Sequence, residues 1–511
     1  MLSKIFRNKN QIFISSLFII SLFIRLFFLP KLPIYGDEAV YAEIIDEFIR
    51  KPTILPTFLG HVIAWKPPLT FIVYSFFIRL FSLIIPNAPV EITYRLPSVI
   101  FGVLSVLALY FLVKKLYDEE SAFISALIFS VSNITILTNE LLLLDSLVVF
   151  LLLVGIIFYI DAERNPKYFY LAGLSGVLLF LTKTFIGFML PLLGIAYYLN
   201  SKEIKKDKRM IWPFIFSIIA VPLTMAIYAI LFYFFAPKVS DINLSYLYDM
   251  LRIVGEKGIA PTFISNLNYF FNLFFPWSLI PFAGLIGLNI RKKNDALILV
   301  WAALVILPLM ANLSYFWYYP PVLPSFCALC AKGLIKIKRP IFIAAVFLIF
   351  YLISLPYFSK DSLLLNILNI FPNYNVSVES EKSIGTFLQN QTEILTMTDQ
   401  GIPGVVFYKF HYEQNPEYLK FIQIVTDPGS PAGYIAFEFA GDIFSGKAYK
   451  DKLNLTKAEE INWVIRNSKF NNHVLMNKRI YGIYLREPLQ NYKIAYSSSD
   501  AELFIISKIQ S

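Results

Sequence analysis

Apolar stretches of about 20 residues recur through the first two thirds of the chain and constrain its fold more than any other feature. A helix of that length crosses the hydrocarbon core of a bilayer, which is roughly 30 Å thick. The 511 residues are 57% hydrophobic and only 16% charged, a balance that excludes a soluble globular protein. The sequence therefore predicts a polytopic α-helical membrane protein.

Basic residues gather in alternate loops, and this pattern predicts the orientation. The clusters are Lys4 with Arg7 and Lys9, Lys114-Lys115, Arg164 with Lys167, Lys202 to Arg209, Arg291 to Lys293, and Lys332 to Arg339. Because positively charged loops stay in the cytoplasm, we expect the N-terminus and these loops on that side. The net charge of +10 follows loops and forms no single basic face, which excludes nucleic acid as a partner.

About eleven membrane-spanning helices fit between these loops. They are predicted near residues 11–29, 94–113, 121–138, 141–160, 168–182, 184–199, 211–235, 270–290, 295–312, 316–332 and 340–357. The apolar piece Leu69–Ile85 contains Arg79 and would break the alternation, so it is predicted to be an interfacial helix. Two outer loops are then long, residues 30–93 and 236–269, and long loops on a compact bundle often carry function.

From about Phe358 the composition changes to that of a soluble α/β domain. Strand-like runs at 404–408 and 434–439 alternate with Gly, Pro, Asn and Asp. The predicted domains are a membrane domain at 1–357 and an extracytoplasmic domain at 358–511. The only cysteines, Cys327 and Cys330, lie in an apolar run, which favours helix packing over redox or zinc chemistry.

The first outer loop opens with Gly36-Asp37-Glu38. The segment that follows, to Arg50, is amphipathic, with an apolar stripe at helical spacing, and is expected to lie flat on the membrane. Gly36 permits a turn that leaves Asp37 at the start of this helix. Asp37 is either the N-cap of this helix or a carboxylate of a functional site. Glu38 is expected to add a supporting charge in the first turn.

Lys66 lies between Trp65 and two prolines, at the start of the interfacial helix. A cation fixed there suits a phosphate, although a Trp-Lys pair that anchors the chain at the interface gives the same pattern. His61 nearby suits a metal or phosphate contact, with a structural role as the alternative.

Asp145 falls a few residues into a predicted span, where a carboxylate needs a partner or a water-filled cavity. Glu140 precedes it at the outer helix end, where the helix dipole favours an acid. Lys183 marks an outer turn between two spans, as a site cation or a snorkelling lysine. Arg95 begins the second span. The topology brings Asp37, Lys66, Arg95, Asp145 and Lys183 to one outer face, and such a set suits acid-base activation of a hydroxyl beside a departing phosphate.

An ordered series of motifs resembles the GT-C glycosyltransferases of the protein O-mannosyltransferase and lipid A aminoarabinose transferase superfamily. The motifs are Gly36-Asp37-Glu38-Ala-Val-Tyr41-Ala-Glu43-Ile, Trp65-Lys66-Pro-Pro-Leu69, Arg95-Leu-Pro-Ser98, Leu144-Asp145-Ser146 and Thr182-Lys183-Thr184. The resemblance covers roughly residues 1–340.

The resemblance implies an inverting transfer of a sugar from a polyprenyl phosphate to an acceptor at the outer membrane face. It implies that Asp37 is the general base, that Asp145 orients the base or the acceptor, and that Lys66 and Lys183 bind the donor phosphate. Arg95 is assigned to the same phosphate, and Glu38, Tyr41, His61 and Glu140 are assigned supporting roles. The acceptor stays open between lipid, glycan and protein. The resemblance also allows a divalent metal near the first outer loop. The sequence offers only His61 and scattered acids as ligands there, without a spacing signature, so the presence of a metal stays open.

Two other classes of function are weighed against an enzyme. A transporter or flippase of a lipid-linked sugar predicts paired charges near mid-bilayer and broken helices in both halves. A noncatalytic scaffold or receptor leaves Asp145 and Lys183 without a role. The charge at one outer face favours the glycosyltransferase.

Overall fold

The computed structural model describes two compact units. The described residues are 9–27, 29, 33–34, 36–58, 61–62, 66–201, 207–235, 288, 292–311, 319–335, 378–389, 391, 394–397, 411, 421–424, 436–437, 462, 465, 472–477, 481, 484–486, 488–498 and 503–509. The helical unit takes in 1–30, 54–56 and 63–363, and the α/β unit takes in 31–53, 57–62 and 364–511. The predicted domain boundary after residue 357 stays a prediction.

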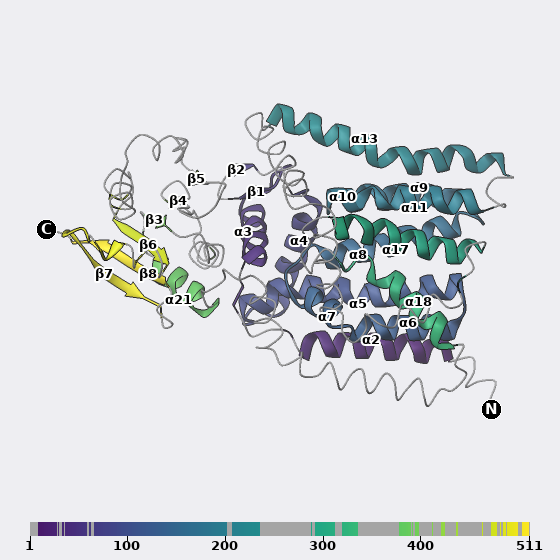
Figure 1. The fold of residues 1–511 in the computed structure, drawn as a ribbon, viewed down its shortest axis with the longest axis horizontal. Coiled ribbons are helices and arrows are strands. Elements are labelled where there is room, and N and C mark those ends of the chain that lie inside the picture. Colours follow the sequence, from purple (N-terminus) through teal and green to yellow (C-terminus); the bar gives the residue numbers. More distant parts are fainter. Residues whose placement is uncertain are drawn as a thin grey trace. The chain divides into compact units, whose positions relative to one another are not determined.

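The helical unit is a bundle whose long helices run side by side (Figure 1). Its elements are α2 (Lys9–Phe27), α4 (Leu69–Ile84), α5 (Val90–Leu116), α6 (Glu119–Val131), α7 (Asn133–Glu140), α8 (Asp145–Asp161), α9 (Lys167–Phe180), α10 (Thr184–Gly187), α11 (Met189–Asn200), η1 (Lys208–Met210), α13 (Ile211–Phe235), α17 (Lys293–Ala311) and α18 (Leu323–Ile335). Helix α5 packs on α6 and α8, and α9 packs on α8 and α13.

Two described helices are long and apolar enough to cross a membrane, Val90–Leu116 and Lys208–Leu231. The pair Glu119–Val131 and Ile134–Glu140 passes the same test together, with a bend of 61° between its halves. The predicted spans at 270–290 and 340–357, the loop 236–269 and the run at 404–408 lie outside the described residues. The total of about eleven spans therefore stays a prediction.

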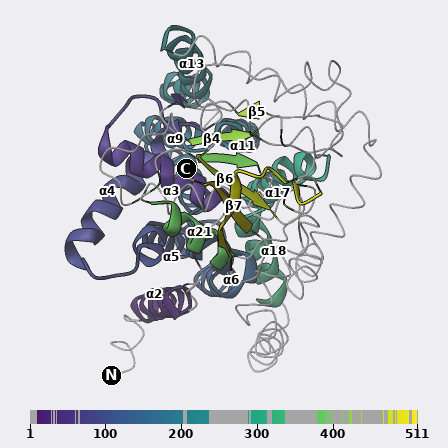
Figure 2. The same cartoon turned by 90° about the vertical axis from the view of Figure 1, so that its left-hand side faces the viewer.

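Helix α4 confirms the helix predicted at 69–85. Figure 2 looks along the bundle, so α2 and α13 are seen end-on, whereas α4 is seen from its side. One face of α4 is buried, including Phe71, Tyr74 and Ile78, whereas Phe76 and Leu83 on other faces are exposed. A transverse helix with an exposed apolar face suits the boundary between lipid headgroups and acyl chains.

Several predicted spans begin or break elsewhere than expected. The predicted span 121–138 divides at Ser132 into α6 and α7, and the predicted span 184–199 divides at Phe188 into α10 and α11. The predicted span 141–160 begins only at Asp145, so this residue opens α8 and does not lie inside it. A carboxylate in the first turn of a helix meets free backbone N–H groups and the positive end of the dipole, which explains the later start.

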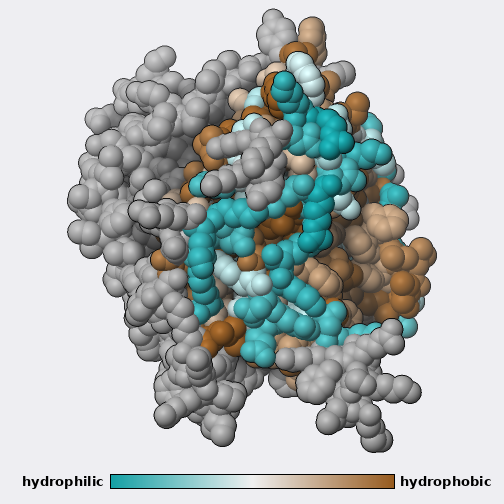
Figure 3. Space-filling view, turned by 90° about the vertical axis from the view of Figure 1, so that its right-hand side faces the viewer, coloured by the Kyte–Doolittle hydropathy of each residue, from teal (hydrophilic) through white to brown (hydrophobic). Residues whose placement is uncertain are grey.

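One end of the bundle carries the basic loops, and we call it the basic end. Three ion pairs join its helices: Lys115 with Asp161 at 2.7 Å, Lys293 with Glu163 at 2.7 Å, and Lys332 with Asp295. In Figure 3, which faces this end, hydrophilic side chains gather across it. We call the opposite end, where α5 and α8 begin and α7 and α9 end, the site end.

The α/β unit contains a six-stranded mixed sheet of order β5-β4-β3-β6-β8-β7. The strands are β3 (Ile394–Met397), β4 (Phe421–Ile424), β5 (Ala436–Phe437), β6 (His473–Asn477), β7 (Tyr492–Ser497) and β8 (Leu503–Lys508). Strand β3 is parallel to β4 and β6, and the remaining pairs are antiparallel. The strand-like run at 434–439 contains β5, and the mixed sheet with α21 (Val378–Leu388) agrees with the predicted α/β character.

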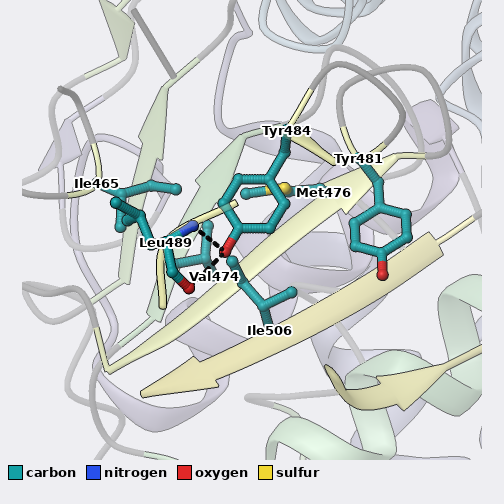
Figure 4. Close-up of a cluster of buried hydrophobic side chains, with 7 residues drawn as sticks. All are labelled: Ile465, Val474, Met476, Tyr481, Tyr484, Leu489 and Ile506. Atoms are coloured by element: carbon teal, nitrogen blue, oxygen red, sulfur yellow. Dashed lines mark hydrogen bonds between the residues drawn. The ribbon is translucent and has the colours of Figure 1, made fainter. Parts of the chain in front are cut away.

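The core of this sheet is an aromatic and aliphatic cluster (Figure 4). Its residues are Ile465, Val474, Met476, Tyr481, Tyr484, Leu489 and Ile506. The Tyr484 hydroxyl accepts a hydrogen bond from the Leu489 N–H at 3.1 Å. Burial raises the pKa of Tyr484, so the hydroxyl stays protonated at neutral pH. The same unit includes α3 (Gly36–Arg50) and the hairpin of β1 (Thr57–Phe58) and β2 (His61–Val62).

Glycines let α9 and α13 approach closely. A Cβ atom added at Gly173 would lie 2.9 Å from the Ser217 Cα, and one at Gly176 would lie 2.9 Å from a Val221 methyl group. Small residues at a helix interface are a common means of close packing in membranes.

We expect Gly173→Ala to destabilise the protein by about 1–3 kcal/mol, because the backbone of α13 must shift to admit the new methyl group. Gly176→Ala is the matched control, since a side chain rather than backbone meets its Cβ and can adjust. Equilibrium unfolding in detergent measures both variants. Equal losses would contradict the close backbone approach.

Candidate active site

A buried ion pair lies at the site end. The Lys183 Nζ donates to the Asp145 Oδ1 at 2.7 Å, and the two side chains are 14% and 4% exposed. Asp145 opens α8, and Lys183 lies in the turn between α9 and α10. The attraction between the two groups offsets part of the cost of removing each of them from water. The prediction that Asp145 needs a partner is met by Lys183.

The connection before Asp145 is fixed by two hydroxyl groups. The Tyr74 hydroxyl of α4 donates to the Leu143 carbonyl at 3.1 Å and shares a 3.3 Å hydrogen bond with the Ser98 hydroxyl of α5. Burial, opposed in part by the Ser98 hydrogen bond, raises the pKa of Tyr74, and the nearby Asp145 carboxylate adds to the rise. Tyr74 is therefore a neutral donor at physiological pH and holds the chain two residues before Asp145.

The turn that carries Lys183 is equally constrained. The Leu69 N–H at the start of α4 donates to the Leu181 carbonyl at 2.9 Å. A Cβ atom at Gly187 would lie only 2.6 Å from the Phe180 Cα, so the turn closes this tightly because residue 187 has no side chain. The lysine is thus presented from a rigid turn between two packed helices.

Lys66 and Arg95 lie in the same unit as this pair. Lys66 is partly buried, three residues before α4, and its carbonyl accepts a hydrogen bond from the Tyr228 hydroxyl of α13 at 3.4 Å. Arg95 is fully buried in the second turn of α5, one turn before Ser98. The Leu69–Leu181 hydrogen bond links the Lys66 segment to the Lys183 turn. Direct contact between predicted site residues is thus seen for Asp145 and Lys183.

Glu140 is buried at the end of α7. Its carboxylate is close enough to interact electrostatically with Arg25, a fully buried residue of α2 that the sequence analysis missed. An arginine inside a membrane-length apolar stretch is itself a signal, because such residues are costly and are retained for a purpose.

The remaining predicted site residues belong to the α/β unit. Asp37 is exposed in the first turn of α3, whereas Glu38 and Tyr41 are buried. His61 lies in β2, paired with Phe58 of β1. The first-turn position of Asp37 agrees with the predicted helix start.

The acids of α3 correct one expectation. The sequence analysis treated this helix as amphipathic, but Glu43, Asp46 and Glu47 are all buried. Two of them have described hydrogen-bond partners: Arg50 donates to Glu43 at 2.9 Å, and His411 shares a 2.7 Å hydrogen bond with Asp46. His411 was missed because 365 residues separate it from Asp46. In the described part of the chain, no three His, Cys, Asp or Glu side chains lie close enough together to hold a metal ion.

Residues 66–233 match the sequence profile of a family described as dolichyl-phosphate-mannose-protein mannosyltransferase. No curated protein sequence matches the chain. The structure of ArnT from Cupriavidus metallidurans bound to undecaprenyl phosphate has a TM-score of 0.63 and 14% identity, over 97% of this chain and 98% of that one.

Archaeal structures are also similar. The Archaeoglobus fulgidus oligosaccharyltransferase in complex with Zn and sulfate has a TM-score of 0.54 and 12% identity, over 97% of this chain and 73% of that one. AglB from the same organism, in complex with an inhibitory peptide and a dolichol-phosphate, has a TM-score of 0.53 and 12% identity, over 92% and 69%. Together with the family match, these likenesses confirm the resemblance to the GT-C superfamily. The chain has a GT-C fold.

We expect Lys183→Met to destabilise the protein by about 3–5 kcal/mol, because it leaves the Asp145 carboxylate buried beside an apolar group. The double variant Asp145→Asn with Lys183→Met should be more stable than Lys183→Met alone, since the stranded charge is gone. Unfolding in detergent at neutral pH measures both.

Lys115→Met is the control for this prediction. Its ion pair with Asp161 has side chains that are 34% and 20% exposed, so the loss should be about 1 kcal/mol or less. If Lys183→Met lost as little stability as Lys115→Met, the result would contradict the burial of the Asp145–Lys183 pair.

Proposed function

We propose that the chain is an inverting glycosyltransferase that moves a sugar from a polyprenyl phosphate to an acceptor hydroxyl. The single observation that carries this proposal is the buried Asp145–Lys183 pair at the site end of a bundle with a GT-C fold. A cation and a carboxylate held rigidly at the mouth of an apolar bundle are unfavourable for stability alone and suit a reaction that displaces a phosphate.

The proposed donor class is supported by the family match and by the similar structures, one of which contains undecaprenyl phosphate and another a dolichol-phosphate. In the proposed reaction, Asp37 accepts the proton of the acceptor hydroxyl as its oxygen forms a bond to the anomeric carbon. The bond from that carbon to the phosphate oxygen breaks, and its electron pair leaves with the polyprenyl phosphate. Inversion at the anomeric carbon is the result of this single displacement.

Each proposed residue has a chemical reason for its role. Asp37 is exposed, as a base that must reach an acceptor needs to be. Lys66, Lys183 and Arg95 supply positive charge for the phosphate, whose negative charge grows as the bond breaks. Asp145 keeps Lys183 in place and orients the base or the acceptor. Glu38, Tyr41, His61 and Glu140 support these groups.

The proposed orientation places the site end and the α/β unit outside the cytoplasm and the N-terminus inside. The basic end, with its lysine and arginine loops, supports this assignment by the positive-inside rule. Lipids, glycans and proteins all offer hydroxyl groups at such a surface, and the acceptor belongs to one of these classes.

We expect Asp37→Asn to lower sugar transfer by about a thousandfold, because the amide cannot take a proton from the acceptor. Lys66→Ala should lower it by about a hundredfold through weaker stabilisation of the leaving phosphate. The measurement is transfer of a labelled sugar from synthetic polyprenyl-phosphate sugars in proteoliposomes, against a panel of lipid, glycan and peptide acceptors.

Asp161→Asn is the matched control, because it makes the same chemical change at the basic end and should leave transfer unchanged. Full activity in Asp37→Asn would refute its role as the base. Movement of the labelled lipid across the bilayer without sugar transfer would replace the enzyme with a flippase.

A further inference from the structure

A chain of buried hydrogen bonds leads from α2 to the residue that follows Asp145. The Arg25 Nε donates to the Asn139 Oδ1 at 3.0 Å, and the Asn139 Nδ2 donates to the Ser146 Oγ at 2.8 Å. Ser146 in turn donates to the Thr138 carbonyl at 3.2 Å. Three of these side chains, Arg25, Asn139 and Ser146, are at most 5% exposed.

The direction of this chain is set by chemistry. A guanidinium group can only donate hydrogen bonds, so Arg25 fixes the oxygen of the Asn139 amide toward itself. The amide nitrogen must then point the other way and donate to Ser146. Arg25 is held in turn by the Ser21 hydroxyl at 2.8 Å and by the Ser130 carbonyl at 3.3 Å.

The link bridges the break before the candidate site. Asn139 is in the last turn of α7 and Ser146 is in the first turn of α8, so their hydrogen bond closes the connection made by Leu141 to Leu144. Within this connection the Leu143 N–H donates to the Leu141 carbonyl at 2.8 Å, and the Val148 N–H of α8 donates to the Leu144 carbonyl at 3.1 Å. The Asn139–Ser146 hydrogen bond adds a side-chain link across the same connection.

Close packing shows that Asn139 has little freedom. A Cβ atom placed at Gly102 of α5 would lie 2.4 Å from the Asn139 Cγ, so the amide lies directly against the α5 backbone. The Asn139 amide is thus confined by α5 on one side and oriented by Arg25 on the other.

We propose that Arg25 and Asn139 are positioning residues for the candidate active site: through Ser146 they fix the first turn of α8 and thereby the Asp145 carboxylate that meets Lys183. This inference rests on the proposed function for its catalytic part, while its structural part stands on the hydrogen bonds alone. Neither residue touches the reacting groups. Helix α2 acts on the site through them.

The experiment compares Ser146→Ala with Ser105→Ala in the full chain, reconstituted in lipid nanodiscs. Ser105 is also 1% exposed, and its hydroxyl bonds only the Phe101 carbonyl of its own helix, so the two changes are chemically matched. The first readout is hydrogen exchange of the backbone amides at 141–148. The second is kcat and the donor KM for sugar transfer, with the unfolding temperature of each variant.

We expect Ser146→Ala to raise exchange at Leu143 and Val148 by about tenfold, the loss of about one hydrogen bond. It should lower kcat by about tenfold while the donor KM changes by less than about twofold, because a displaced carboxylate weakens the transition state and leaves binding intact. Ser105→Ala should change neither quantity.

The variants Asn139→Ala and Asn139→Leu separate positioning from packing. Leucine at 139 refills the space of the amide without its hydrogen bonds, so stability should recover in part in Asn139→Leu while kcat stays low. Recovery of kcat together with stability would overturn the proposal, as would equal exchange in Ser146→Ala and Ser105→Ala.

Exchange also keeps the two proposals distinct. If the wild-type protein transfers no sugar from any donor, the proposed function fails, and the exchange of 141–148 still decides whether Asn139 and Ser146 fix the start of α8.

Discussion

The Asp145–Lys183 ion pair is the interaction on which the site end depends. Two charges removed from water are stable only together, so every element that carries one of them must hold it within reach of the other. This requirement accounts for the contacts nearby. Tyr74 and Ser98 fix the Leu143 carbonyl, and the Leu69 N–H fixes the Leu181 carbonyl. Helix α4 takes part in both, so the transverse helix holds together the two turns from which the pair is presented.

Buried charge occurs at both ends of the bundle. At the basic end, Lys115 and Lys293 are about one-third exposed and pair with acids that water also reaches, an arrangement that contributes little to stability. The Lys332–Asp295 pair at the same end is buried, with side chains that are 18% and 1% exposed. At the site end, Arg25, Arg95 and Asp145 are at most 3% exposed. Burial of a charged pair alone therefore does not mark a reactive site in this bundle.

Sequence reasoning predicted much of this arrangement, and its failures have physical causes. Apolar length and basic loops predicted the helices at α5, α9 and α13 to within a few residues, because those signals are local. The breaks at Ser132 and Phe188 were missed, although Asn133 and Gly187 adjoin them, because the predicted spans followed apolar length alone. The break before α8 was predicted at 139–140 and lies at Leu141–Leu144, since those four leucines are as apolar as the helix that follows. Asp145 and Lys183 were predicted by residue type, but their contact depends on how α8 and α9 pack. Asp46 with His411 and Arg25 with Asn139 are tertiary pairs that periodicity cannot reveal.

Helix α3 shows how the carboxylate of Asp37, the proposed base, can be both reachable and fixed. A base exposed on a mobile segment would sample many positions and lose the advantage of orientation. In α3 the acids beyond the first turn are buried and bound, Glu43 by Arg50 and Asp46 by His411, so the helix is anchored along its length. Asp37 is exposed in the first turn, beside the buried Glu38. Because His411 comes from the C-terminal part of the chain, the α/β unit joins α3 to a segment 365 residues beyond Asp46, and under the proposed function this unit fixes the helix that carries Asp37.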